Sequence, residues 1–160
     1  KNVEKPILLI VEPERIEEAI TRLARVGFDN IVGYLDKGFT SWTDANLEIA
    51  TISTISAKDF SEIIKEKKVE IYDVRKPSEF FSEHIIDAKN IPLISISENK
   101  QEIIKNNNVY MHCAGGYRSI IANSILKSKG FHNIIDVEGG FSSIKEYNIK
   151  ITDYICPSEL

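Results

Sequence analysis

The stretch that decides the fold is Val109-Tyr-Met-His-Cys-Ala-Gly-Gly-Tyr-Arg-Ser119. Its first part, Val109–His112, predicts a short buried strand, and the residues from Arg118 to Lys129 predict a helix that Gly130 ends. The side chains expected on the inner face of this helix are Ile120, Ile121, Ile125 and Leu126. The loop between strand and helix should lie at the carboxyl edge of a sheet, where open α/β proteins bind their ligands.

This loop has the residues that an anion-binding site with a reactive thiol requires. Gly115 and Gly116 allow backbone conformations closed to other residues, so successive N–H groups can form an anion-binding nest. The following helix adds the positive end of its dipole. Cys113 would then react as a thiolate, and Arg118 would offer a fixed positive charge to an anionic substrate. A buried structural thiol and a solvated arginine are the alternatives.

The residues before and after the loop predict a regular alternation of strands and helices. Ser56-Ala-Lys-Asp59 has the pattern of a capping box that begins a helix, and Pro77 suits the first turn of another. Val69–Val74 and Asn133–Val137 have the composition of strands. This order predicts an α/β fold whose mostly parallel sheet is covered by helices on both faces.

The first fifty residues repeat the second half of this pattern at a constant offset. The matched pairs are Arg15 and Arg118, Ala19 and Ala122, Leu23 and Leu126, Gly27 and Gly130, and Asn30 and Asn133. We therefore expect a partial unit in residues 1–50 and a complete unit in residues 54–155, with chance similarity as the alternative. Ile10 stands where the complete unit has Cys113, and Glu12-Pro13-Glu14 replaces the glycines, so the partial unit is predicted to be inactive.

Composition narrows the classes of protein. With 42% hydrophobic and 28% charged residues, the chain suits a soluble globular protein, and a net charge of −4 indicates no nucleic-acid partner. There is no apolar run of the roughly 18 residues that span a bilayer, and no signal-peptide pattern, so we expect a cytoplasmic protein without a membrane partner. The two cysteines and three histidines lack metal-ligand spacing, and we expect no metal and no cofactor.

The loop resembles the active-site loop of the rhodanese (sulfurtransferase) superfamily, and the resemblance covers residues 54–155. The other segments that follow in the family's order are Asp73-Val-Arg75, Glu79-Phe80, His84-Ile85, Asn90-Ile91-Pro92 and Glu138-Gly-Gly-Phe141. Glu83 and Ile144 depart from the family's usual glycine and tryptophan. The resemblance implies a three-layer rhodanese-like fold with a mostly parallel five-stranded sheet, preceded by the C-terminal half of a second, degenerate rhodanese-like unit.

The resemblance also implies a sulfurtransferase. Cys113 would accept sulfane sulfur from thiosulfate, polysulfide or a persulfide, and would pass it to a thiol or to cyanide. Cys113 and Arg118 are the expected catalytic residues. The expected substrate-binding residues are Ala114, Gly115, Gly116, Tyr117, Ser119, Asp73 and Arg75.

Several of these roles have alternatives. The Ser119 hydroxyl either hydrogen-bonds the persulfide or caps the helix. Asp73 and Arg75 either line the pocket or form an ion pair with each other. We expect His84 and His112 to be structural, and Cys156 to be either a bystander or a relay thiol.

Two other functions compete with sulfur transfer. A phosphatase or arsenate reductase also places a thiolate before an arginine, but these enzymes need Cys-x5-Arg, and this chain has the shorter Cys-x4-Arg. A non-catalytic regulatory or interaction module is the other alternative, because fold alone does not establish activity.

The tandem arrangement resembles the C-terminal region of proteins that begin with a metallo-β-lactamase-like hydrolase domain. Half a sheet leaves unpaired strand edges and an uncovered apolar face. We therefore expect the partial unit to form a homodimer contact, or to pack against domains upstream in a longer chain.

Overall fold

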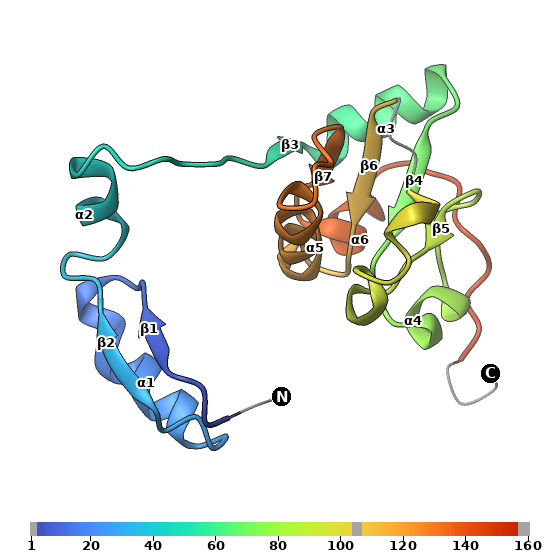
Figure 1. The fold of residues 1–160 in the computed structure, drawn as a ribbon. Helices are drawn as coiled ribbons and strands as arrows, with labels where there is room; N and C mark the ends of the chain where they lie inside the picture. Colours follow the sequence, from blue (N-terminus) through green and yellow to red (C-terminus); the bar gives the residue numbers. More distant parts are fainter. Residues whose placement is uncertain (1–2, 104–106, 157–160) are drawn as a thin grey trace. The chain divides into compact units, whose positions relative to one another are not determined.

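The computed structural model describes residues 3–103 and 107–156, and the chain divides into two compact units at residue 50 (Figure 1). Each unit is described by itself. Among the described residues, no helix combines the length and apolar character that a membrane crossing requires.

The second unit is built on a parallel sheet of five strands in the order β3-β7-β6-β4-β5. The strands are β3 (Ser53–Ile55), β4 (Glu70–Asp73), β5 (Lys89–Asn90), β6 (Val109–His112) and β7 (Ile134–Val137). This confirms the predicted five-stranded sheet, in which every pair of neighbours is parallel. Since β6 is the middle strand and is buried throughout, the residue that follows it lies at the centre of the carboxyl edge.

Helices cover both faces of this sheet (Figure 1). They are α3 (Ala57–Glu66), α4 (Pro77–Ser82), α5 (Tyr117–Lys127) and α6 (Gly140–Ile144), with short 3-10 turns at η2 (Leu93–Ser95) and η3 (Lys100–Glu102). Ala122 and Leu126 of α5 pack on one face with Tyr72, Met111 and Ile134. Residues of α3 and α6 pack on the other face with Ile71, Tyr110 and Val137.

Half of the capping box predicted for α3 is present. The Asp59 amide donates to Ser56 Oγ at 3.1 Å, so Ser56 is the N-cap and the helix begins at Ala57. The Asp59 carboxylate accepts from the Ser56 hydroxyl at 2.7 Å instead of from the Ser56 backbone amide. Helix α3 then buries Phe60 against Tyr110, with ring centroids 5.2 Å apart. The Ser56 cap and the apolar spacing therefore both predict the position of this helix correctly.

The prediction for the inner face of α5 was wrong at two residues. Ile120 and Ile121 are 47% and 39% exposed, whereas the positions buried along the helix are Ser119, Ala122, Asn123 and Leu126. These four positions have the helical spacing of a buried stripe, but two of them are polar. Apolar spacing alone therefore predicts Ile120 and Ile121 on the inner face, where the structure has Ser119 and Asn123.

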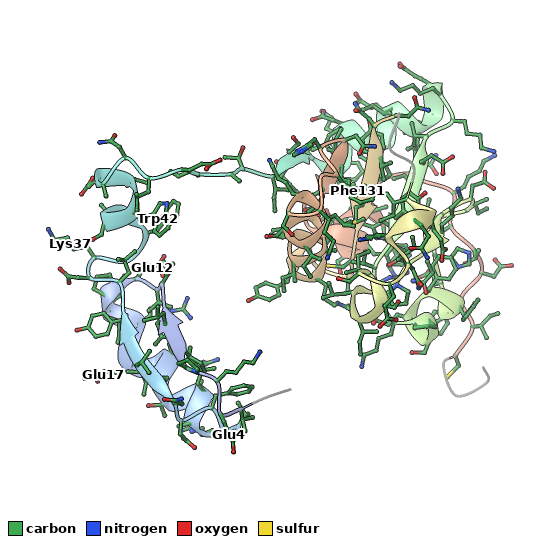
Figure 2. All side chains as sticks on the ribbon, in the orientation of Figure 1. Glu4, Glu12, Glu17, Lys37, Trp42 and Phe131 are labelled. Carbon is green, nitrogen blue, oxygen red and sulfur yellow. The ribbon has the colours of Figure 1, made fainter. Side chains whose placement is uncertain are left out.

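The first unit has the element order of the second half of the second unit. Its elements are β1 (Ile7–Leu9), η1 (Pro13–Arg15), α1 (Ile16–Ala24), β2 (Ile31–Tyr34) and α2 (Phe39–Asp44). Strands β1 and β2 are parallel, and Leu8 pairs with Gly33 just as Met111 pairs with Asp136 at the corresponding positions. Trp42 Nε1 donates to Glu48 O at 3.1 Å near the end of this unit (Figure 2).

We predict that Phe60→Ala destabilises the second unit by about 3–5 kcal/mol, because it opens a cavity in a packed core. Phe60 is 0% exposed, and Phe81→Ala is the matched control because Phe81 is 57% exposed. The control should cost less than about 1 kcal/mol. Urea unfolding followed by circular dichroism measures both, and equal losses would contradict the placement of α3.

Candidate active site

Cys113 follows the middle strand β6 directly, and the loop after it is fixed by the start of α6. Phe141 N donates to Cys113 O at 2.7 Å, and Ser142 N donates to Ala114 O at 2.9 Å. Gly140 makes this approach possible, because a Cβ at that position would lie 2.5 Å from Cys113 O. The Glu138-Gly-Gly-Phe141 segment therefore holds the loop through its backbone.

The loop ends in a left-handed residue that begins α5. Gly116 is the N-cap, with φ of +90°, and Gly115 has no positive φ. Among the described residues, the N–H groups of Ala114 to Ser119 donate to no backbone acceptor. Such amides at the amino end of a helix are available to an anion.

The Cys113 thiol is enclosed, with the residue only 1% exposed. The Ser119 hydroxyl donates to it, with Oγ 3.6 Å from Sγ, and the same Oγ lies 3.1 Å from Gly116 O. Met111 and Ala122 belong to the same core cluster. The Cys113 side chain is therefore almost completely shielded from solvent in the structure. The structure has no disulfide between Cys113 and Cys156.

Arg118 forms a two-pronged ion pair with Glu79 of α4, at 2.6 and 2.8 Å. The hydrogen bond to Arg118 lowers the pKa of Glu79, and the same bond raises the pKa of Arg118. Arg118 is therefore already neutralised, and an anionic donor would compete with Glu79 for it. The sequence pointed to Glu79 only within a family motif, because a carboxylate in the first turn of a helix usually serves that helix. It does so here, accepting from Lys76 N at 3.2 Å.

Asp73 and Arg75 form a buried ion pair with each other. Arg75 Nη2 lies 2.6 Å from Asp73 Oδ2 and also donates to Glu83 O at 2.7 Å, while its guanidinium lies over the Phe141 ring at 4.1 Å. Of the two roles that the sequence left open, the ion pair is the one that is formed. A contact of either side chain with substrate stays a prediction.

The two histidines that the sequence analysis singled out, His84 and His112, both contact protein groups. His112 is fully buried, and burial lowers its pKa although Asp73 opposes this effect. Its Nδ1 lies 3.3 Å from Cys113 O, and its ring stacks on Phe141 at 5.9 Å. His84 Nδ1 lies 2.7 Å from Phe80 O. Among the described residues, neither imidazole ring forms a hydrogen bond with the Cys113 thiol.

A second buried carboxyl, Asp136 of β7, was missed by sequence reasoning. It is 1% exposed, and burial raises its pKa to about 6, although the nearby side chains of Ser119 and Asn123 lower it. A single acidic residue inside the apolar strand Ile134–Val137 was the available signal. In the described part of the chain, no group of three His, Cys, Asp or Glu could hold a metal ion.

Comparison with known proteins identifies the family. The family model for the rhodanese-like domain matches residues 56–147. The chain therefore belongs to the rhodanese-like domain family. A rhodanese-related crystal structure from Thermoplasma volcanium is 33% identical, with a TM-score of 0.57, and the match covers 62% of this chain and 97% of that one.

The chain is also similar to curated proteins, among them a thiosulfate sulfurtransferase at low sequence identity. It is 39% identical over 75 residues to the uncharacterized protein YqhL of Bacillus subtilis, covering 47% of this chain and 60% of YqhL. It is 27% identical over 94 residues to the thiosulfate sulfurtransferase GlpE of Coxiella burnetii, covering 59% of this chain and 88% of GlpE. The chain thus spans less than two thirds of YqhL. Association with a metallo-β-lactamase-like hydrolase is not shown by these relatives and stays a prediction.

We predict that Arg75→Met destabilises the second unit by about 3–5 kcal/mol, because it leaves the Asp73 carboxylate buried without a counter-ion. Lys89→Met is the control, since its ion pair with Glu70 is exposed and should cost about 1 kcal/mol or less. Thermal unfolding at neutral pH measures both. Similar losses in the two variants would show that the buried pair has no special structural weight.

Proposed function

We propose that this chain, as a member of the rhodanese-like domain family, is a sulfurtransferase that carries sulfur as a persulfide on Cys113. The observation that carries the proposal is a cysteine at the centre of the carboxyl edge, beside a run of backbone amides without backbone acceptors. The likeness to GlpE, named a thiosulfate sulfurtransferase, supports the same reaction.

The reaction has two steps in which one sulfur atom changes partner. The Cys113 thiolate attacks the outer sulfur of thiosulfate, the donor's S–S bond breaks, and sulfite leaves with the bonding electron pair. The product is a Cys113 persulfide anion. An acceptor thiolate or cyanide then attacks the outer sulfur and regenerates the Cys113 thiolate. Loop amides and the amino end of α5 would stabilise the charge on the terminal sulfur.

Arg118 would bind the donor by exchanging partners. In the structure its guanidinium is held by Glu79. A doubly charged donor such as thiosulfate can displace a single carboxylate more readily than a donor with less charge can. Arg118 would then select among anionic donors, and Glu79 would keep the site neutral when no donor is bound.

The first unit would take no part in this chemistry. Ile10 stands at the position that corresponds to Cys113, and Pro13 begins a short 3-10 turn where the complete unit has its glycine loop. The matching element order and the matching Leu8–Gly33 register support its origin as half of a degenerate rhodanese-like unit. Exposed apolar residues on its strands, Leu8, Val32 and Tyr34, favour contact with another protein surface.

A second candidate function is a non-catalytic interaction module. The enclosure of the Cys113 thiol and the neutralised Arg118 favour it. The two candidates differ in one measurable property, which is the ability of Cys113 to take up sulfur.

We predict that treatment with thiosulfate or polysulfide adds one sulfur atom, about 32 Da, to the protein in intact-mass spectrometry. Cyanide or dithiothreitol should reverse the gain. Cys113→Ser should show no gain, and Cys156→Ser is the matched control that should behave like the unchanged protein. If the sulfur appeared on Cys156, or nowhere, sulfur transfer at Cys113 would be excluded.

We also predict that Arg118→Ala lowers kcat/KM for thiosulfate by about tenfold or more, a change of about 1.4 kcal/mol, and lowers it less for polysulfide. The reason is that thiosulfate presents sulfonate oxygens that can accept paired hydrogen bonds from the guanidinium, whereas polysulfide, which is also an anion, has none. Glu79→Gln should lower KM for thiosulfate, because it releases the Arg118 guanidinium from its ion pair. Steady-state assays with both donors measure this, and equal losses for both donors in Arg118→Ala would remove the donor-binding role.

A further inference from the structure

Two polar side chains, Ser119 and Asn123, occupy the buried stripe of α5, and the first of them contacts the Cys113 thiol. Ser119 and Asn123 are one helical turn apart on the face that packs on the sheet, and both are buried. Asp136 lies on the same face of the sheet, because its strand neighbours Ile134 and Met111 belong to the core cluster under α5. Cys113 belongs to that cluster too.

The side chain of Ser119 is close to both the thiol and the carboxyl. Ser119 Oγ donates to Cys113 Sγ at 3.6 Å and lies 3.1 Å from Gly116 O, and the Ser119 side chain is near enough to the Asp136 carboxyl to lower its pKa. Asn123 Nδ2 donates to Ser119 O at 3.2 Å, which fixes the helix turn that carries the hydroxyl. Asp136 Oδ1 has no hydrogen-bond partner among the described residues. It is therefore able to accept a proton.

The charges around Asp136 do not compensate it. Glu138, at the end of the same strand, raises its pKa further. The neighbouring strands present Thr54 and Met111 at its register, which do not titrate. On α5, the guanidinium of Arg118 is paired with Glu79, and Lys127 Nζ donates to Thr51 O.

A carboxylate in such surroundings has a functional interpretation. Burial without a counter-ion is costly, and the cost falls on the ionised form. A carboxyl with a pKa of about 6 is close to the operating pH, where proton exchange is efficient. By contrast, Asp73 on the other face is fully matched by Arg75. These two buried carboxyls therefore differ in that Asp73 has a paired cation and Asp136 has none among the described residues.

We propose that Asp136 is a positioning residue for the nucleophile, which receives, through the hydroxyl of Ser119, the proton that the Cys113 thiol loses during sulfur uptake. This inference rests on the proposed function. It assigns Ser119 a proton-transfer role in addition to a contact with the persulfide or a cap on the helix.

The transfer balances without any further reactant. The Sγ–H bond breaks and its proton passes to Ser119 Oγ, while the hydroxyl's own proton passes to the Asp136 carboxylate. The electron pair left on sulfur forms the bond to the outer sulfur of thiosulfate, and sulfite leaves with the pair of the broken S–S bond. The site ends as a Cys113 persulfide anion with a protonated Asp136, and the total charge is unchanged.

The test is the pH dependence of sulfur loading, measured in a single turnover by quenched intact-mass spectrometry in a Cys156→Ser background. The rate in the protein with Asp136 should rise as pH passes about 6 and then level off. Asp136→Asn should load roughly 100-fold more slowly at neutral pH. Its rate should keep rising and converge with the other at alkaline pH, where hydroxide removes the thiol proton directly. A loss by the same factor at every pH would overturn the proposal.

Matched variants separate proton transfer from a structural defect. Ser119→Ala should lose as much as Asp136→Asn, and the double variant no more than either, since both act in one path. Asp44→Asn, at an exposed position of the first unit, should not change the rate. Release of a preloaded persulfide to cyanide needs no thiol proton to leave, so Asp136→Asn should change it less than about twofold. Additive losses, or equally slowed release, would overturn the proposal.

Folding of the variant is checked by thermal unfolding. The raised pKa means that stability is present while Asp136 is protonated and is lost as pH rises through about 6. Asp136→Asn should therefore melt at or above the temperature of the unchanged protein at pH 7.5, and close to it at pH 4. If this variant did not fold, the pH profile of Ser119→Ala would decide the question in the same way.

Failure of the proposed function can be told from failure of the relay. If the unchanged protein takes up no sulfur, alkylation of Cys113 by iodoacetamide, which also consumes the thiolate, is followed over the same pH range. The relay would be supported, without sulfur transfer, if Asp136→Asn were alkylated more slowly than the unchanged protein at neutral pH and at the same rate at alkaline pH. Parallel profiles would reject it.

Discussion

The constraint on which the site depends is the close approach of α6 to the loop after β6. Two backbone hydrogen bonds from Phe141 and Ser142 occupy the carbonyl groups of Cys113 and Ala114. They are possible only because Gly140 has no side chain to collide with the Cys113 carbonyl. The carbonyl groups of Cys113 and Ala114 are thus occupied, whereas the N–H groups of residues 114–119 have no backbone acceptor among the described residues. The glycine pair after β7 therefore shapes the site as directly as the glycines of the loop itself.

The sheet separates two buried carboxyls that have opposite surroundings. On the α6 side, Asp73 is matched by the guanidinium of Arg75, which also covers the Phe141 ring. This pair ties the end of β4 to the segment that clamps the loop. On the α5 side, Asp136 has hydroxyl and amide neighbours, and none of the described residues pairs a cation with it. A matched charge fixes a structure, whereas an unmatched one with a pKa near neutrality can exchange a proton.

Local sequence patterns predicted the frame of the site better than its contacts. The strand at Val109–His112, the N-cap at Ser56 and the cysteine at the strand end all follow from neighbouring residues, and the structure contains them. The inner face of α5 could not be predicted from apolar spacing, because Ser119 and Asn123 occupy two of its buried positions. Nor could the Arg118–Glu79 pair, since it joins residues 39 positions apart on two helices. Buried polar residues break the apolar spacing by which the inner face of a helix is recognised.

The charges near Cys113 imply that a negative charge on its sulfur would be stabilised by backbone amides and not by side chains. Arg118 is neutralised by Glu79, and Asp136 brings a negative charge or a neutral acid, so the side chains near Cys113 supply no net positive charge. A persulfide anion held at this position must then be stabilised by the amides of the loop and by the amino end of α5. Amide dipoles do not have to be desolvated or neutralised with each turnover, as a free guanidinium would. Under the proposed function, the loop amides would hold the single terminal sulfur atom, and Arg118 would bind the larger anion that delivers it.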